Sequence, residues 1–281
     1  MKFCGHTMGT PEMDVFEAID FFAWAGFEGI ELRCWSDGVL DLEPGNASPN
    51  RYTARLGARI VSYARERGLE LACLTPYHAD YASPARCQRT LEGMRRALEI
   101  AHNLGIARVR AYGGAYPQLD PSGSYPAGVG LPDAWERTVS GLRELGDAAG
   151  ALGITLCVEI HKGTLTETAD DALRMMSLVD MSSVRVIYQM SHITQTPADV
   201  DREIKLLAPY IHHVHFSAHP YLREGRAGLA DALLSALVQI GYDGYVSDEY
   251  GKYWHPEWPG PEEAMVEGLK YLKRRLAEVR K

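Results

Sequence analysis

The stretch LPDAWERTVSGLRELGDAAGALGITLCVEI, residues 131–160, contains a helical pattern followed directly by a short apolar run. Apolar side chains recur over residues 131–152 at spacings of three and four, which predicts a helix with one apolar face. Gly153 comes next, where the residue past a helix end often needs a positive φ. The run ITLCVEI, residues 154–160, then has the length and composition of a buried strand.

The same order of strand and helix recurs along the whole chain. Eight short apolar runs occur, and a longer helical pattern follows each of them: KFCGH (2–6), GIELR (29–33), LELACLT (69–75), ARVRAYG (107–113), ITLCVEI (154–160), VRVIYQM (184–190), IHHVHFS (211–217) and GYVSDEY (244–250). Glycines stand where five of the helices are expected to end: Gly26, Gly68, Gly105, Gly153 and Gly241. Thr168 followed by Asp171 resembles a capping box that opens a further helix.

Strands that alternate with helices predict a parallel sheet, and eight is the number that closes a (β/α)8 barrel. An open, doubly wound sheet is the alternative. It would more often carry a glycine-rich phosphate turn after its first strand, and GHTMGTPEM (5–13) lacks that pattern. We therefore predict an α/β protein with a single (β/α)8 TIM-barrel domain over residues 1–281.

Composition and charge narrow the classes of function. The 281 residues are 46 % hydrophobic and 23 % charged, as in ordinary globular proteins. The net charge of −8 disfavours a general nucleic-acid binder. The cysteines are odd in number, five, and form no CxxC pair, which indicates reduced thiols. With no signal-peptide pattern and no apolar stretch of membrane-spanning length, we expect a cytoplasmic protein without a membrane partner. By analogy with other barrels, it is expected to form a homo-oligomer, a dimer or tetramer.

Polar residues interrupt the last four predicted strands near their carboxyl ends. Alternate residues of a strand share a face, and this phase points Glu159, Gln189, His215 and Glu249 into the barrel. Burying two carboxylates, an imidazole and an amide together is costly unless a partner neutralises them. A divalent cation would do so, and this mixed oxygen and nitrogen set suits Mn²⁺ or Mg²⁺, with Co²⁺ or Zn²⁺ as alternatives. The His213 side chain points to the same side of its strand as His215 but lies one pleat deeper in the barrel, so we expect it to pack behind the site.

Further pocket candidates come from the other strand ends and the loops after them. Aromatic faces suit the C–H surfaces of sugars, and His or Lys side chains can bond their hydroxyls. The candidates are His6, Trp35, His78, Tyr112, His161, Lys162 and His192. Lys162 could instead pair with Glu159 or act as a catalytic acid. Arg223 and Arg226 precede a helix start, where an anion could bind; a solvated charged loop is the alternative.

Four segments give the chain a family resemblance. FEGIELR (27–33), CVEIHKGTLTET (157–168), HVHFS (213–217) and GYVSDEY (244–250) resemble strands two, five, seven and eight of the xylose-isomerase-like TIM-barrel superfamily. This group includes sugar isomerases, epimerases and endonuclease IV. The resemblance implies a divalent metal held by Glu159, Gln189, His215 and Glu249, with the two glutamates as acid and base. It also matches His192 to a substrate-contacting histidine. Gln189 departs from the common pattern, which has Asp there, so the ligand set is less negative by one charge.

These observations favour a metal-dependent isomerase or epimerase acting on a sugar, a polyol or a keto acid. Glu159 and Glu249 would move a proton next to a carbonyl while the metal stabilises the enediolate. A lyase on the same scaffold, either a dehydratase or a C-glycoside-cleaving enzyme, would use the same proton abstraction and is the main alternative. Gln189 also leaves open a sugar-binding barrel without catalysis. An abasic-site endonuclease would need more metal ligands and a basic surface, and both are lacking in the pattern.

Overall fold

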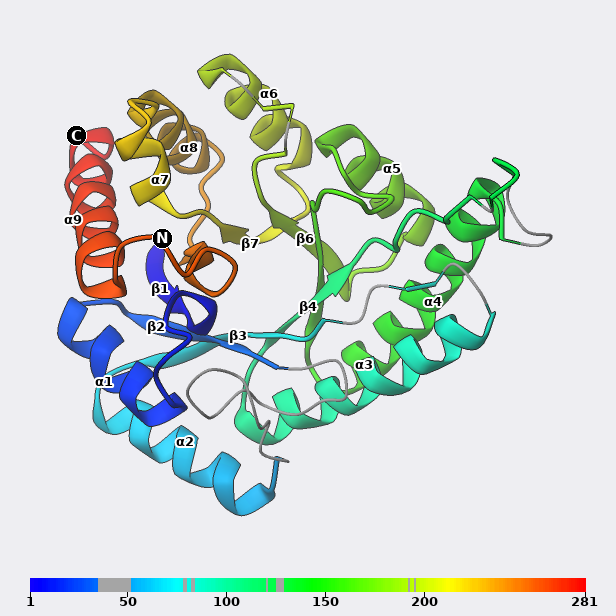
Figure 1. Cartoon of the computed structure of the whole chain (residues 1–281), viewed down its shortest axis with the longest axis horizontal. Coiled ribbons are helices and arrows are strands. Elements are labelled where there is room, and N and C mark those ends of the chain that lie inside the picture. Colours follow the sequence, from blue (N-terminus) through cyan, green and yellow to red (C-terminus); the bar gives the residue numbers. More distant parts are fainter. Residues whose placement is uncertain are drawn as a thin grey trace.

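Eight parallel strands close into a barrel in chain order, which confirms the predicted fold class (Figure 1). The computed structural model describes residues 1–34, 52–77, 80–81, 84–119, 121–124, 129–191, 193–194 and 196–281. The strands are β1 (Lys2–His6), β2 (Gly29–Arg33), β3 (Glu70–Thr75), β4 (Arg108–Tyr112), β5 (Thr155–Glu159), β6 (Val184–Tyr188), β7 (Ile211–His215) and β8 (Tyr245–Asp248). Each pairs with the next, and β8 returns to β1 in a register that runs from Lys2 opposite Tyr245 to Gly5 opposite Asp248.

Helices surround the barrel on its outside, as the ring of ribbons in Figure 1 shows. They are α1 (Val15–Ala25), α2 (Ala54–Glu66), α3 (Pro84–Leu104), α4 (Leu131–Ala151), α5 (Ala169–Val179), α6 (Pro197–Leu207), α7 (Ala218–Arg223), α8 (Ala227–Gln239) and α9 (Pro261–Val279). The predicted loop after β7 differs, because residues 218–223 form the short helix α7 before α8 begins. None of the helices in the described ranges is long and apolar enough to cross a membrane.

The predicted helix ends agree with the backbone. Gly26, Gly68, Gly105, Gly153 and Gly241 all have positive φ angles, between 69° and 89°. The Thr168 side chain accepts a hydrogen bond from the backbone N–H of Asp171 and caps α5. The five glycines therefore mark the ends of α1, α2, α3, α4 and α8, and Thr168 marks the start of α5.

Charged and polar groups fill the middle of the barrel. Glu31, Arg110, Glu159, His213 and His215 come from four strands, and each is at most 1 % exposed. Branched apolar residues usually fill the inside of a TIM barrel. The outward faces of the strands are apolar here and pack under the helices in one continuous core. The polar interior is therefore the unusual part of this barrel.

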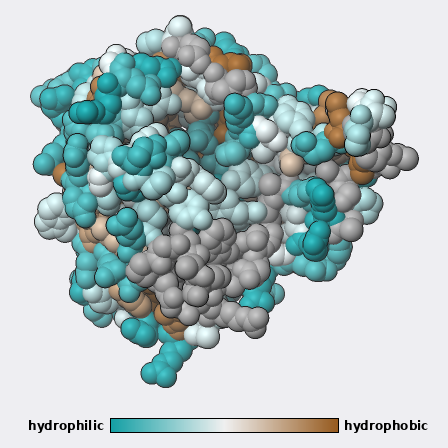
Figure 2. Space-filling model, viewed as in Figure 1, coloured by the Kyte–Doolittle hydropathy of each residue, from teal (hydrophilic) through white to brown (hydrophobic). Residues whose placement is uncertain are grey.

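The molecular surface is mostly hydrophilic on the face that Figure 2 shows. The strongly hydrophobic residues on this face form small, separate patches. Scattered patches of this kind are normal on globular proteins. This face therefore carries no broad apolar docking area over its described residues.

The close packing of β1 against α1 gives a test of the fold. A Cβ on Gly5 would lie 2.3 Å from ring atoms of Phe22, whose side chain is fully buried. We expect Gly5→Ala to lower the free energy of unfolding by about 1–3 kcal/mol, as overpacked cores do. Chemical denaturation measures this loss. Gly228→Ala in α8 is the control, because its nearest neighbour, the Pro197 Cγ, lies 3.8 Å away. Equal losses in the two variants would contradict the explanation.

Candidate metal centre

The four residues predicted to share a site come together at one mouth of the barrel. Glu159 and His215 end β5 and β7, while Gln189 and Glu249 directly follow β6 and β8. His215 Nδ1 lies 2.8 Å from Glu159 Oε1 and 3.4 Å from Glu249 Oε2. Ligand-type atoms of these three residues all lie within 4.8 Å of one another. The predicted convergence is therefore present, and the arrangement can hold a metal ion.

The Gln189 amide lies between the two carboxylates. One end of the amide lies 3.4 Å from Glu249 Oε2. The other end lies 2.9 Å from Glu159 Oε1 and 3.2 Å from the carbonyl oxygen of Ile160. We assign the nitrogen to this second end, because both of its neighbours are acceptors. The amide oxygen then faces Glu249 and adds a fourth oxygen or nitrogen donor to the site.

A buried arginine that the sequence analysis missed holds Glu159 from the other side. Arg110 Nη1 lies 2.9 Å from Glu159 Oε2, and its Nη2 donates to the carbonyl oxygen of Pro76 at 2.8 Å. The guanidinium lies over the rings of Tyr77 and Tyr112, 4.4 and 4.3 Å from their centroids. Burial raises the pKa of Glu159, but Arg110 and His215 outweigh that effect and lower it to about 2. Glu159 is thus a fixed anion.

A signal for Arg110 was present in the sequence. The run RVRAY places a charged residue in the middle of a strand whose neighbours are apolar, and such a residue in a barrel needs a partner inside. The structure also corrects the suggestion that Lys162 pairs with Glu159. Lys162 is exposed, and the partner is Arg110.

Glu31 of β2 supports the site from deeper in the barrel. Its carboxylate lies 2.8 Å from His213 Nε2 and 3.0 Å from His215 Nε2, and the Thr75 hydroxyl donates to it. Because Glu31 engages Nε2 of His215, the Nδ1 atom of that ring is the one turned toward Glu159 and Glu249. A carboxylate in this position orients a metal-ligating histidine. His213 packs behind the site, as its strand phase predicted.

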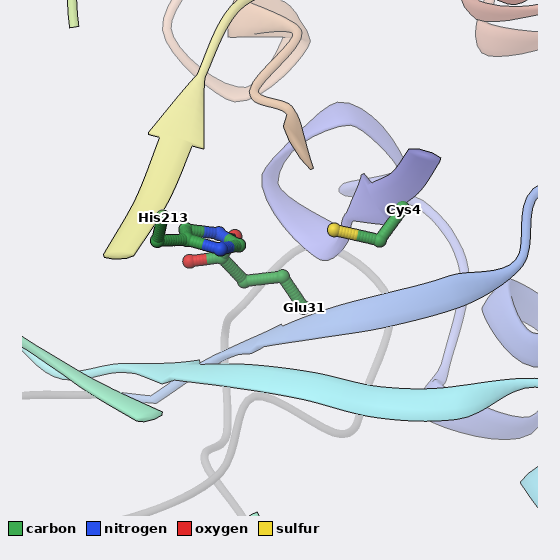
Figure 3. A group of neighbouring side chains, drawn as sticks. All are labelled: Cys4, Glu31 and His213. Atoms are coloured by element: carbon green, nitrogen blue, oxygen red, sulfur yellow. The ribbon is translucent and has the colours of Figure 1, made fainter. Parts of the chain in front are cut away.

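Figure 3 shows Cys4, Glu31 and His213 directed to the same part of the interior from β1, β2 and β7. Their ligand-type atoms also lie within 4.8 Å of one another. Burial and the nearby Glu31 carboxylate raise the pKa of the Cys4 thiol well above its usual value, which keeps the thiol protonated. The Glu31 oxygens are already engaged by two imidazoles and a hydroxyl. We therefore interpret this group as support for His215.

A pocket of about 320 Å³ opens over three of the four site residues, Gln189, His215 and Glu249. Aromatic rings form part of its walls, and Arg226 lies among the described lining residues. The aromatic lining residues are Phe216, Tyr221, Trp254, His255 and Trp258. These aromatic lining residues were not predicted, although GKYWHPEWPG (251–260) places three of them, Trp254, His255 and Trp258, in a cluster after the last strand.

The structure places the other residues that were predicted to line the pocket in different positions. The His161 ring packs edge-on against the ring of Tyr112, with 5.0 Å between the ring centroids. Tyr112 is one of the two tyrosines whose rings lie against the Arg110 guanidinium. His6 is fully buried inside the barrel, 3.9 Å from Glu31, and is not among the described residues that line the pocket. Arg223 is exposed on α7, and Arg226 of the same loop lines the pocket in its place. Trp35, His78 and His192 lie outside the described residues.

With this geometry established, comparison with known proteins identifies the family. Residues 19–275 match the family model described as xylose isomerase-like TIM barrel. The chain belongs to this family. The resemblance inferred from the four strand segments is therefore confirmed.

Individual curated relatives and a solved structure are also similar to this chain. The 3-dehydroshikimate dehydratase of Bacillus anthracis is 23 % identical over 202 residues, which cover 71 % of this chain and 65 % of the relative. The inosose dehydratase of Lacticaseibacillus casei is 24 % identical over 163 residues, 50 % of this chain and 54 % of the relative. The matched regions thus span about half to two thirds of these relatives. The crystal structure of D-psicose 3-epimerase in the presence of D-fructose has a TM-score of 0.77 at 20 % identity, covering 98 % of this chain and 99 % of that chain.

The ion pair of Arg110 with Glu159 gives a test of the site. In chelator-treated protein, Arg110→Met leaves a buried carboxylate without its cation, so we expect a loss of unfolding free energy of about 3–5 kcal/mol. The double variant Arg110→Met/Glu159→Gln should recover much of that loss, because neither charge remains. Arg185→Met is the control, since Arg185 of β6 donates to the backbone carbonyl oxygens of Met181 and Val184 and not to a carboxylate within the described residues. A double variant no more stable than Arg110→Met would contradict the interpretation.

Proposed function

We propose that this protein is a divalent-metal-dependent isomerase or epimerase that acts on a sugar or a related polyol or keto acid. The observation that carries the proposal is the convergence of Glu159, His215 and Glu249, with Gln189 beside them, under an open pocket. Glu249 in the wall of this pocket, with Glu159 buried beside it next to His215, provides the carboxylates that proton transfer next to a carbonyl requires.

The residues present fit a divalent cation. Donor atoms that share one cation stand about 3 Å apart when each lies about 2.1 Å from it, and the separations of 2.8 and 3.4 Å about His215 Nδ1 are of this size. Carboxylate, amide and imidazole donors together suit Mn²⁺ or Mg²⁺ best, with Co²⁺ or Zn²⁺ as alternatives. When bound, such a cation supplies a positive charge that polarises a substrate carbonyl.

Residues of the chain itself have the other roles in the proposed reaction. Glu249 lines the pocket and is placed to take a proton from the carbon next to the carbonyl. Arg110 and His215 hold Glu159, and Glu31 fixes the ring of His215. The rings of Tyr221, Trp254 and Trp258 offer flat apolar faces, which suit the C–H surface of a sugar ring.

Dehydration of a keto-polyol is the second candidate. The observation in its favour is that two curated relatives are named 3-dehydroshikimate dehydratase and inosose dehydratase. Both reactions begin with the same proton abstraction, and they differ in whether a neighbouring hydroxyl then leaves. The same pocket and the same carboxylates therefore serve either reaction.

The setting of the reaction is also proposed from the sequence. All five cysteines, each within the described ranges, are free thiols. This agrees with a reducing cytoplasm. Participation in carbohydrate metabolism follows from the proposed class of substrate. A dimer or tetramer stays a prediction.

The test starts from protein purified without chelator and analysed for metal. It is then incubated with Mn²⁺ and with D-psicose, inosose or 3-dehydroshikimate, and epimer formation and loss of water are followed. We expect turnover of one of these compounds or a close analogue, and Glu249→Gln should lower it by about 10²-fold or more while metal stays bound. No bound metal, together with no thermal stabilisation by Mn²⁺, would instead favour a sugar-binding barrel.

The unusual ligand Gln189 gives a separate prediction about the metal. Gln189→Asp adds a carboxylate beside the other donors, so we expect the Mn²⁺ dissociation constant to fall about tenfold or more. Isothermal titration calorimetry at fixed pH measures it. Gln118→Asp is the control, because Gln118 lies in a loop outside the site. An unchanged or weaker affinity in Gln189→Asp would show that this amide is not a ligand.

A further inference from the structure

We propose that Glu203 of α6 is a positioning residue for the candidate metal centre, because it holds the loop after β6 in the conformation that presents Gln189 to the cation. Glu203 acts from outside the barrel, through two hydroxyl groups that stand on either side of Gln189 in the sequence, those of Tyr188 and Thr194. The inference rests on the proposed function, since it takes Gln189 as a ligand of the cation.

The Glu203 carboxylate binds both sides of the connection between β6 and α6. The Tyr188 hydroxyl donates to Glu203 Oε2 at 2.9 Å, and the Thr194 hydroxyl lies 2.9 Å from Oε1 and 3.0 Å from Oε2. These three residues are each at most 3 % exposed. Because the only hydrogen of the Thr194 hydroxyl is donated to the carboxylate, its oxygen accepts from the Ser191 hydroxyl at 3.1 Å. One acidic group thus orders three side chains of β6 and its loop.

Gln189 lies between these two anchor points. Tyr188 is the last residue of β6, and adjacent residues of a strand point to opposite faces, so the bond from Tyr188 to α6 directs Gln189 toward the barrel mouth. On the other side, the Thr194 N–H donates to the carbonyl oxygen of Ser191 at 3.0 Å, which closes a turn in the loop. The loop also supplies Met190 to the pocket. Release of these anchors would therefore move a metal ligand and a part of the pocket wall together.

An acidic group is a costly choice at the position of Glu203. The residue lies on the buried face of α6, whose other buried residues, Val200, Ile204 and Leu207, are apolar. Burial raises the pKa of Glu203, and the two hydroxyl donors offset this effect only in part. A well-packed apolar side chain of similar size avoids that cost. What the acid adds, and an apolar side chain cannot, is the direction of its hydrogen bonds to the loop.

The test measures the Mn²⁺ dissociation constant by isothermal titration calorimetry at fixed pH. We expect Glu203→Met to raise this constant about tenfold, the lower end of the effect of removing groups that orient metal ligands. In Glu203→Gln, a carbonyl oxygen at the position of Oε2 still accepts from both hydroxyls. We therefore expect this conservative variant to restore the dissociation constant to within about threefold of the wild-type value.

A triple variant separates positioning from stability. Glu203→Met alone leaves two buried hydroxyls without their acceptor, which destabilises the fold. The triple variant Tyr188→Phe/Thr194→Val/Glu203→Met removes those hydroxyls as well, so we expect its denaturation midpoint to lie above that of Glu203→Met. Its Mn²⁺ dissociation constant should nevertheless stay about tenfold above the wild-type value, because the loop has lost its anchors. A residue that only stabilised the fold would recover its stability and its metal affinity together.

Glu70→Met is the matched control. Glu70 also accepts a hydrogen bond from a tyrosine hydroxyl, that of Tyr245 at 2.7 Å, but it lies at the start of β3, at the opposite end of the barrel from the site. We expect its Mn²⁺ dissociation constant to equal that of the wild type. A wild-type constant in the triple variant, or an equal loss in Glu70→Met and Glu203→Met, would overturn the inference and leave the proposed function standing. No Mn²⁺ binding by the wild-type protein would overturn both.

Discussion

Three buried or partly buried carboxylates, Glu31, Glu159 and Glu249, meet around a single imidazole at the barrel mouth. Their charges cannot be left unbalanced out of contact with water, because isolated buried ions are very costly. Arg110 balances one of them, and the imidazoles of His213 and His215 engage another. The polar filling of the barrel follows from this requirement. The apolar core lies outside the strands, under the helices, where it stabilises the fold without taking part in the site.

Strand phase explains how much of the site the sequence predicted. Alternation along a strand says which side chains point inward, and the ends of parallel strands meet at one edge, so Glu159, His215 and Glu249 could be grouped correctly. Alternation does not say which inward side chains touch across the barrel, because that depends on the stagger of strands far apart in the chain. The pairing of Arg110 with Glu159, and of Glu31 with two histidines, was missed for this reason.

The same distinction separates the well-predicted helices from the poorly predicted pocket. The glycines that end the helices act through their own backbone conformation, so local sequence is enough to place them. The wall of the pocket is made by the loops after β7 and β8, whose rings and Arg226 meet only in the folded chain. Family membership adds the scaffold, but relatives that are named as dehydratases and a fold neighbour named as an epimerase share that scaffold. The scaffold alone therefore does not decide between these reactions.

The contact between His215 and Glu31 has a thermodynamic consequence. Burial lowers the pKa of His215, but Glu31 and Glu249 outweigh it and raise the pKa well above its usual value, so both ring nitrogens carry protons between carboxylates. A cation that binds at Nδ1 must displace the proton that this atom shares with Glu159 and Glu249. Proton and metal are thus competing ligands for the same three side chains. With the proton bound, Arg110 and His215 offset two of the three carboxylate charges. A divalent cation that replaced this proton would offset the third, so the charge of the site itself favours binding of such a cation.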